Sequence, residues 1–300
     1  MKTLDKVINY GIIKTIKIIR DRFFDYISKK ILKTVNKFGL YSINQYINPY
    51  IIEKKLEGEE FLLSIEDKDA KLWYDLSGRD NDWHELGFIK NELLKKGDEF
   101  IEVGSHHGCT TILLSRWVGE TGRGYAFEPG VSNFKILEKN LKLNSIINVK
   151  CLNNVVGDDR KKVSFKENKD YSMSSSVSND TSFHGDLIDQ ITLDEFSKVY
   201  PNLIKIDVQG YVDQVLNGMS RILKESGSNF AIEIDPVSVI NSCGGNLSNI
   251  FKNLELPSYQ YYAQFDTNKP PQKILYSEIL RTWEKVNNCS EDLHLFLKKT

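Results

Sequence analysis

From Glu99 onward, short apolar segments alternate with amphipathic helical segments along the chain. Strands separated by helices of this length form βαβ units, in which consecutive strands lie parallel. The pattern therefore predicts an α/β fold with a mostly parallel sheet and helices on both of its faces. The predicted strands are 100–103, 124–127, 149–152, 203–206, 230–234, 259–265 and 292–298, and the predicted helices are 110–118, 132–143, 212–223 and 276–287.

The residues before 99 differ in character from this domain. Over residues 1–40, apolar side chains recur at steps of three and four, and ten Lys and Arg residues stand against three Asp residues. This pattern predicts a basic amphipathic helical arm. The arm either packs on the core or on a second subunit, or it rests on an anionic membrane surface. Residues 41–98 are predicted to be a lead-in of helices and loops, and residues 99–300 to form the functional domain.

Composition narrows the class of protein. The formal net charge of -1 gives no electrostatic reason to expect a nucleic-acid partner. The four cysteines are far apart and form no C-x-x-C pair, which indicates reduced thiols rather than disulfides or a zinc site. The sequence lacks an apolar run of about 18 residues and a secretory signal pattern. We therefore expect a cytoplasmic protein, with peripheral attachment to the inner membrane surface through residues 1–40 as the open alternative.

The first predicted strand runs directly into a glycine-containing turn, Gly104-Ser-His-His-Gly108, which a helix follows. Small residues there allow a ligand to approach the backbone, and the helix N-terminus offers N–H groups. A dinucleotide site needs glycines at 104, 106 and 109, but His106 and Cys109 occupy the last two positions. The turn therefore disfavours a pyrophosphate, and with it a nucleotide-dependent oxidoreductase.

Glu128 ends the second predicted strand, 24 residues after Gly104. At this distance, α/β nucleotide-binding folds place an acidic residue that binds ribose hydroxyls. A carboxylate can accept hydrogen bonds from both hydroxyls of one ribose. A glycine turn and a ribose acid without a pyrophosphate cradle favour an adenosine-bearing ligand that lacks a diphosphate. S-adenosylmethionine fits this description.

Several blocks of the sequence follow one another in this order: Glu102-Val-Gly-Ser-His-His-Gly-Cys-Thr110, Ala126-Phe-Glu-Pro129, Asn154-Val-Val-Gly-Asp158, Ile191-Thr-Leu-Asp-Glu-Phe196 and Leu203-Ile-Lys-Ile-Asp-Val-Gln-Gly210. Through these blocks, residues 101–235 resemble the FkbM family of methyltransferases. The resemblance implies a Rossmann-like class I methyltransferase fold with a seven-stranded sheet, S-adenosylmethionine as cofactor, and O-methylation of a sugar, glycan or natural-product hydroxyl. The expected partner is therefore a small-molecule or glycan acceptor.

Asp207 follows the fourth predicted strand of this order, where the architecture places residues that face both cofactor and acceptor. We expect it to act as a general base or as the anchor of the cofactor amine. Lys205 lies on the same face of that strand and is expected to pair with Asp207 or Glu233. No residues show metal-ligand spacing, although a Mg²⁺-dependent variant remains open. The predicted cofactor-binding residues are Glu102, Gly104, Ser105, His106, Gly108, Glu128, Asn154, Asp158 and Asp207.

The sequence also departs from the family pattern. Glu102 stands for the usual Asp and His106 for the usual Asn, whereas Gln209 and Val212 replace two usual glutamates. The last two changes remove carboxylates on the expected acceptor side. They leave open an alternative function, a non-catalytic module that binds the adenosine cofactor or another partner through the retained fold.

Overall fold

The computed structural model describes residues 47–76, 83–166, 176–178, 185–196 and 200–300. The chain divides into two compact units, Met1–Ile47 and Asn48–Thr300. The predicted arm over 1–40 lies outside the described residues. Within the described part of the chain, no helix has both the length and the apolar character needed to cross a bilayer.

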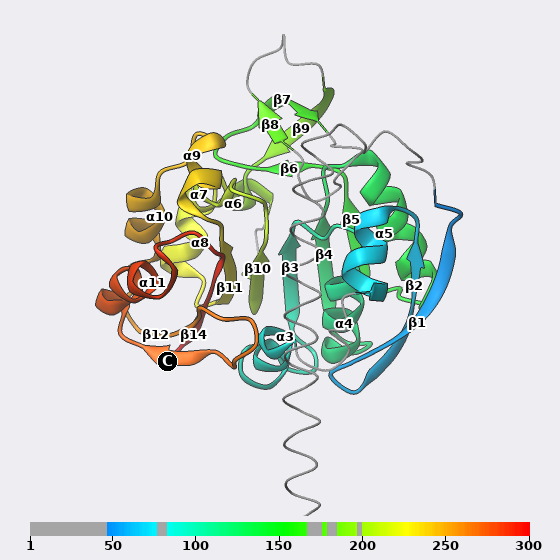
Figure 1. Cartoon of the computed structure of the whole chain (residues 1–300), viewed down its shortest axis with the longest axis horizontal. Helices are drawn as coiled ribbons and strands as arrows, with labels where there is room; N and C mark the ends of the chain where they lie inside the picture. Colours follow the sequence, from blue (N-terminus) through cyan, green and yellow to red (C-terminus); the bar gives the residue numbers. More distant parts are fainter. Residues whose placement is uncertain (1–46, 77–82, 167–175, 179–184, 197–199) are drawn as a thin grey trace, which may run out of the picture. The chain divides into compact units, whose positions relative to one another are not determined.

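The second unit is built around a sheet that has eight strands within the described residues, in the order β13-β12-β14-β11-β10-β3-β4-β5 (Figure 1). The five strands from β5 to β11 pair in parallel, while β14 runs antiparallel to its two neighbours and β13 runs antiparallel to β12. All seven predicted strands are present, so the predicted α/β fold is confirmed, and short β13 adds an eighth strand. The strands are β3 Glu99–Val103, β4 Arg123–Phe127, β5 Val149–Leu152, β10 Leu203–Ile206, β11 Asn229–Ile234, β12 Tyr259–Gln264, β13 Gln272–Ile274 and β14 Leu293–Lys299.

Strand β3 is the middle one of the five parallel strands, and later strands are added on both sides of it. The chain first adds β4 and β5 on one side, and later adds β10 and β11 on the other. The order therefore reverses between β3 and β10, which is the point where open α/β sheets bind ligands beyond the carboxyl ends of their strands. The turn at 104–108 and Asp207 follow these two strands directly.

Helices cover the sheet on both sides (Figure 1). On β3, Ile101 and Val103 belong to the same core cluster as residues of α7 and α8, whereas the side chains of Phe100 and Glu102 alternate to the opposite face. The predicted helices are confirmed, but 212–223 is split into two. The helices are α4 Cys109–Val118, α5 Val131–Leu143, α6 Leu193–Phe196, α7 Val212–Asn217, α8 Ser220–Glu225, α9 Val237–Ser242, α10 Leu247–Leu254 and, after the 3-10 turn η4 Tyr276–Glu278, α11 Ile279–Asn287.

Gly218 lies between α7 and α8. A Cβ atom at this position would lie 1.8 Å from the carbonyl oxygen of Gly157. The backbone just after β6 (Val155–Val156), a strand of a second sheet, therefore packs closely against Gly218. That sheet has the order β6-β9-β7-β8, and the alternation of strands and helices did not predict it. Its strands are β6 Val155–Val156, β7 Lys161–Lys166, β8 Ser176–Ser178 and β9 Asp186–Ile191.

The prediction of helices and loops for 41–98 is wrong over part of its length. Strands β1 (Tyr50–Leu56) and β2 (Glu59–Ile65) form an antiparallel hairpin. Its two turn residues, Glu57 and Gly58, have φ values of 48° and 80°, as tight hairpin turns require. Lys and Glu residues are frequent in this segment and are depleted in strands generally, so the sequence did not indicate strands here. The rest of the lead-in is helical, comprising α2 Lys68–Ala70, the π-helix η2 Lys71–Leu76, α3 His84–Phe88 and η3 Ile89–Leu93.

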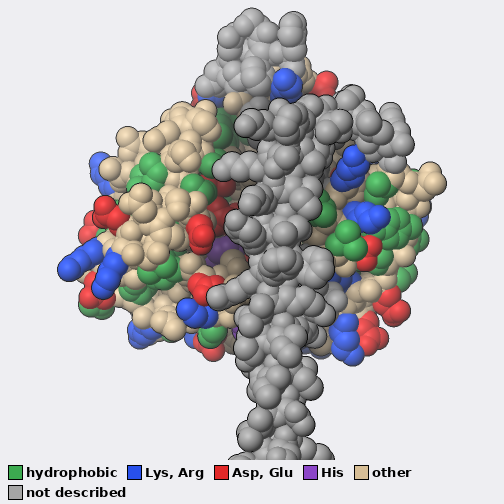
Figure 2. Space-filling model, in the orientation of Figure 1, with side chains coloured by type: hydrophobic (Ala, Val, Ile, Leu, Met, Phe, Trp, Pro, Cys, Tyr) green, Lys and Arg blue, Asp and Glu red, His purple; other side chains and the backbone are tan. Residues whose placement is uncertain are grey.

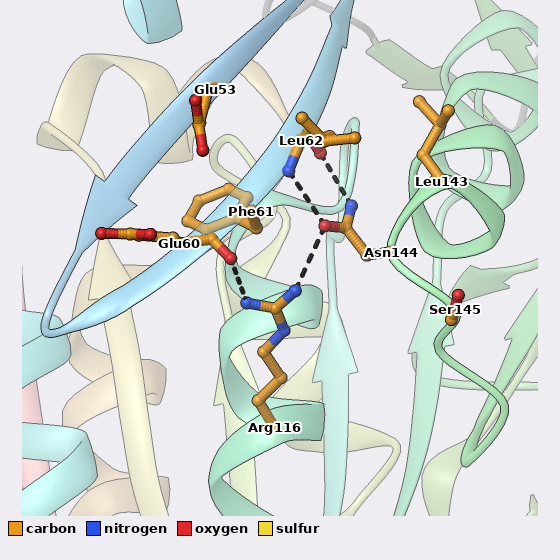
Figure 3. Close-up of a pocket in the computed structure, with 8 residues that line it drawn as sticks. All are labelled: Glu53, Glu60, Phe61, Leu62, Arg116, Leu143, Asn144 and Ser145. Carbon is orange, nitrogen blue, oxygen red and sulfur yellow. Dashed lines mark hydrogen bonds between the residues drawn. The ribbon is translucent and has the colours of Figure 1, made fainter.

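Asn140 of α5 and Asn144, the C-cap of this helix, bind the outer edge of the hairpin, and Figure 3 shows the contact of Asn144 with Leu62. The Asn144 amide accepts from the Leu62 N–H at 2.9 Å and donates to the Leu62 carbonyl at 2.7 Å. The Asn140 amide accepts from the Ser64 N–H at 2.8 Å and donates to the His107 carbonyl, also at 2.8 Å. These amides replace a neighbouring strand along the exposed edge of β2. Through Asn140, they also tie the hairpin to the turn that follows β3.

Candidate functional site

The turn after β3 is held by backbone contacts to both neighbouring strands. The N–H groups of Gly104 and Ser105 donate to the Phe127 carbonyl at 2.9 and 3.0 Å. The Asp207 N–H donates to the Val103 carbonyl at 3.0 Å. Gly104 has φ +87°, and a Cβ atom there would lie 1.7 Å from the Asp207 carbonyl oxygen. Glycine at 104 therefore allows the end of β10 to close against the turn.

Glu128 lies beside this turn, as the sequence predicted. Its side chain is buried, and its two oxygens accept hydrogen bonds from the N–H groups of His106 at 2.8 Å and Gly130 at 2.9 Å. Burial raises the pKa of Glu128 to about 7, against the opposing effect of these two bonds. The Asn133 side chain also hydrogen-bonds to Glu128. A carboxylate has about four lone-pair sites, so one further hydrogen bond can be accepted, which matches a ribose hydroxyl.

The residues after β5 are arranged differently from the prediction. Asn153 donates from its amide to the carbonyls of Glu128 and Pro129, both at 2.9 Å. Asn154 instead donates to the Asp189 carbonyl at 3.1 Å, and Asp158 accepts from the Gln190 amide at 3.1 Å. The structure thus ties Asn154 and Asp158, both predicted to bind the cofactor, to the second sheet, and the neighbouring Asn153 contacts the Glu128 segment.

A buried charged group lies below the turn, on the face of the sheet opposite α7 and α8. Glu102 and Lys205 are register partners on neighbouring strands, and their charged atoms lie 3.9 Å apart. Lys205 Nζ also lies 2.9 Å from Asp207 Oδ2, so the predicted Lys205–Asp207 pair is confirmed. Burial opposes the lysine charge, but Asp207 and Glu102 outweigh it and raise the pKa of Lys205 above its ordinary range.

The two carboxylates of this group differ in access. Glu102 is 1% exposed, it accepts a hydrogen bond from the Thr111 hydroxyl, and burial raises its pKa. The Asp207 side chain is 34% exposed. Glu102, which was predicted to bind the cofactor, is therefore buried beside the Lys205 ammonium. The more exposed Asp207 carboxylate can reach a bound molecule.

Further acidic side chains gather at the ends of β11 and β14. One carboxylate oxygen from each of Glu233, Asp235 and Asp292 lies within 4.8 Å of the others. Such oxygens are the ligands that hard divalent cations prefer. The spacing of these residues in the sequence does not indicate the group. Asp292 lies 57 residues after Asp235, and only the antiparallel pairing of β14 with β11 brings the two together. Acidic side chains also lie beside a histidine near the middle of the face in Figure 2.

His294 adds a positive charge to this region. Its Nδ1 lies 2.5 Å from Glu85 Oε2, and it faces Glu233 across the β11–β14 pair. Burial opposes its charge, but Glu85, Glu233 and Asp207 outweigh it and raise the pKa of His294 to about 10. Burial raises the pKa of Glu233, and it raises that of Asp235 to about 7. His294 is therefore charged at neutral pH and partly offsets the surrounding carboxylates.

The adjacent histidines of the turn are both directed inward. The His106 ring stacks on the His107 ring, with centroids 3.9 Å apart, and its Nδ1 lies 3.0 Å from the Tyr74 hydroxyl. Burial lowers the pKa of His106, so its ring is neutral. His107 is fully buried, with Nε2 3.1 Å from Asn133 Oδ1 and 3.3 Å from Asp67 Oδ2. Its Nδ1 has no hydrogen-bond partner within the described residues.

The two departures near Asp207 have different structural settings. Val212 is completely buried in the core cluster at the start of α7, where an ionised glutamate would be costly. Gln209 adopts φ +49° and is partly exposed. Because Val212 packs into the core, its side chain takes no part in binding a polar acceptor.

Residues 102–242 match the family described as the methyltransferase FkbM domain, which favours a methyltransferase over a nucleotide-dependent oxidoreductase. Residues 102–242 are an FkbM methyltransferase domain. The FkbM domain begins at the end of β3 and extends into α9, so it contains the turn, Glu128, Asn153 and Asp207. The lead-in over 48–98 and the strands β12 to β14 lie outside it.

Solved structures with a similar fold include methyltransferases of several kinds. A methyltransferase FkbM from Methylobacillus flagellatus KT shares 17% identity over 72% of this chain, with a TM-score of 0.47, and the chain spans 47% of its length. A SAM-dependent O-methyltransferase from Thermotoga maritima shares 13% identity over 83% of this chain and 78% of its own, with a TM-score of 0.41. An rRNA methylase from Streptococcus thermophilus shares 13% identity over 71% and 93%, with a TM-score of 0.42. No curated protein matches the sequence.

Proposed function

We propose that this protein transfers a methyl group from S-adenosylmethionine to a hydroxyl group of a small or glycan-like acceptor. The arrangement of Glu128 beside the Gly104 turn is the observation that carries the proposal. It combines a carboxylate that can still accept a hydrogen bond from a ribose hydroxyl and a turn that lacks the glycines for a pyrophosphate. An FkbM methyltransferase domain holds both features.

The residues at the turn fit such a cofactor. Gly104 leaves no side chain between the turn and the end of β10. Helix α4 begins without a side-chain cap, so its N-terminus favours an anionic group such as the cofactor carboxylate. Glu128 would hold the ribose, and Asn153 fixes the backbone around Glu128. Asp207, across the turn from Glu128, would then lie on the side of the amino-acid end and the reacting methyl group.

Asp207 is the candidate for the proton transfer. When bound, the cofactor supplies an electrophilic methyl group on a sulfonium. Lys205 engages Asp207 Oδ2 at 2.9 Å, which holds the carboxylate in one orientation and leaves Oδ1 to receive the acceptor's hydroxyl proton. Alignment of the two reactants is expected to supply most of the rate, since positioning alone can lower a barrier by about 7–11 kcal/mol. A general base adds roughly 10²–10⁴-fold.

A transfer assay tests the proposal. The protein is incubated with S-adenosylmethionine labelled in the methyl group and with monosaccharides, oligosaccharides or phenolic natural products in parallel. We expect label in an alkali-stable ether on one hydroxyl class, together with S-adenosylhomocysteine. A protein that binds both cofactor and acceptors but transfers no label to any of them would instead be the non-catalytic module.

Cofactor affinity is expected to depend on pH through Glu128. Because burial raises the pKa of Glu128 to about 7, the carboxylate is largely protonated at pH 6 and ionised at pH 8. The ionised form accepts stronger hydrogen bonds from ribose hydroxyls. Affinity for S-adenosylhomocysteine, measured by calorimetry, should therefore rise up to about tenfold between pH 6 and pH 8.

The matched variant is Glu128→Gln, which keeps the shape of the side chain but cannot ionise. It should bind more weakly at pH 8 and lose the pH dependence. A variant that retains the wild-type pH dependence would assign the titration to another group.

A further inference from the structure

Side chains from the lead-in, outside the FkbM domain, contact both histidines of the cofactor turn. The Tyr74 hydroxyl on η2 lies 3.0 Å from His106 Nδ1. Asp67, the N-cap of α2, lies 3.3 Å from His107 Nε2. The family match starts only at residue 102, so these contacts belong to the part of this chain that the family comparison leaves unassigned.

The lead-in side chains are themselves held in place. Tyr74 is 8% exposed, and its carbonyl accepts a hydrogen bond from the buried Lys54 ammonium at 2.7 Å. Asp67 uses its other oxygen to accept from the Ala70 N–H at 2.7 Å. Side chains fixed in this way can orient a neighbouring group without first losing conformational freedom.

His106 connects the lead-in to the ribose acid. Its ring contacts Tyr74, while its backbone N–H donates to Glu128. Its φ of +48° is unusual for a residue other than glycine, so the surrounding contacts must maintain this conformation. The Tyr74 contact is one of those that hold the ring in its stacked position on His107.

The end of β10 also lies against this turn, since a Cβ atom at Gly104 would lie 1.7 Å from the Asp207 carbonyl oxygen. Burial is the main reason that the pKa of Tyr74 is raised, so its hydroxyl keeps its proton at neutral pH. If the ribose is bound at Glu128, the amino-acid end of the cofactor lies on the Asp207 side of the turn.

We propose that Tyr74 is a positioning residue that holds the His106 turn in the conformation that binds the amino-acid end of S-adenosylmethionine. The inference rests on the proposed function, because it assumes that this turn binds that cofactor. The lead-in then contributes a residue to the cofactor site. The region matched by the family, 102–242, does not contain the whole of that site.

The test uses Tyr74→Phe in the full chain and compares two ligands by calorimetry. S-adenosylhomocysteine carries the amino-acid end, whereas adenosine lacks it. Loss of one hydrogen bond should weaken binding of S-adenosylhomocysteine roughly 2- to 10-fold. Adenosine affinity should fall less, because the hydroxyl reaches the ribose only indirectly, through the His106 N–H that donates to Glu128.

Tyr50→Phe provides a matched control. The Tyr50 hydroxyl donates to Asp75 at 2.5 Å and so binds the same helix, one residue beyond Tyr74. This variant should leave both affinities unchanged, and thermal unfolding should show that both variants fold. Unchanged S-adenosylhomocysteine affinity in Tyr74→Phe would overturn the inference, and so would equal losses for the two ligands, which indicate general loosening. Wild-type protein that binds neither ligand would contradict the proposed function itself.

Discussion

Gly104→Ala is expected to lower the free energy of unfolding by at least about 3 kcal/mol and to abolish binding of S-adenosylmethionine. Alanine at φ +87° costs roughly 1–2 kcal/mol from the left-handed backbone alone. The added Cβ would also lie 1.7 Å from the Asp207 carbonyl oxygen. Because this neighbour is backbone, it can move only if β10 shifts away from the turn. Chemical denaturation measures the loss of stability, and calorimetry measures the loss of binding.

Gly244→Ala separates the two contributions. Gly244 has φ +74°, but a Cβ atom there would meet nothing within 4 Å. This variant should lose only the backbone contribution, about 1–2 kcal/mol, and should bind the cofactor normally. Equal losses of stability in the two variants would show that the close approach of β10 to the turn is unimportant.

Asp207→Asn is expected to lower turnover by about 10²–10⁴-fold while changing cofactor affinity much less. Asparagine keeps the size of the side chain and can still accept a hydrogen bond from Lys205, but its amide cannot take the acceptor's proton. Single-turnover kinetics with a labelled methyl group measure the chemical step, and calorimetry measures affinity in parallel. If affinity falls as much as turnover, Asp207 anchors the cofactor amine and is not the base.

Asp189→Asn is the control for this substitution. Asp189 forms an ion pair with Lys162 at 2.8 Å, but both side chains are well exposed. Exposed pairs of this kind contribute at most about 1 kcal/mol. Turnover and affinity should both stay at the wild-type level, which would show that the effect at Asp207 arises from its position and not from loss of any paired carboxylate.

The sequence was informative where a single local rule applies. The βαβ alternation placed the central strands because their apolar runs are continuous and helices separate them. Glu128 was located by its distance from Gly104, and Lys205 was placed with Asp207 because alternate residues of a strand share one face. Each of these inferences needs only residue type and spacing along the chain.

The missed features depend on contacts between distant segments. Strand β5 ends at Leu152, as predicted, but its end does not indicate that the Asn153 side chain reaches the Glu128 segment. The Glu233 cluster needs the antiparallel insertion of β14, and the Tyr74 contact needs the fold of the lead-in. Glu102 was assigned to the cofactor because its burial beneath Lys205 cannot be recognised from residue type alone.

The central claim is that the turn and Glu128 bind S-adenosylmethionine. Calorimetric titration of the wild-type protein with S-adenosylmethionine, and separately with NAD, tests it most directly. We expect saturable binding of one S-adenosylmethionine per chain and no measurable heat with NAD, because His106 and Cys109 occupy the positions where a pyrophosphate cradle needs glycine. Absence of S-adenosylmethionine binding, or an equal affinity for NAD, would contradict the account.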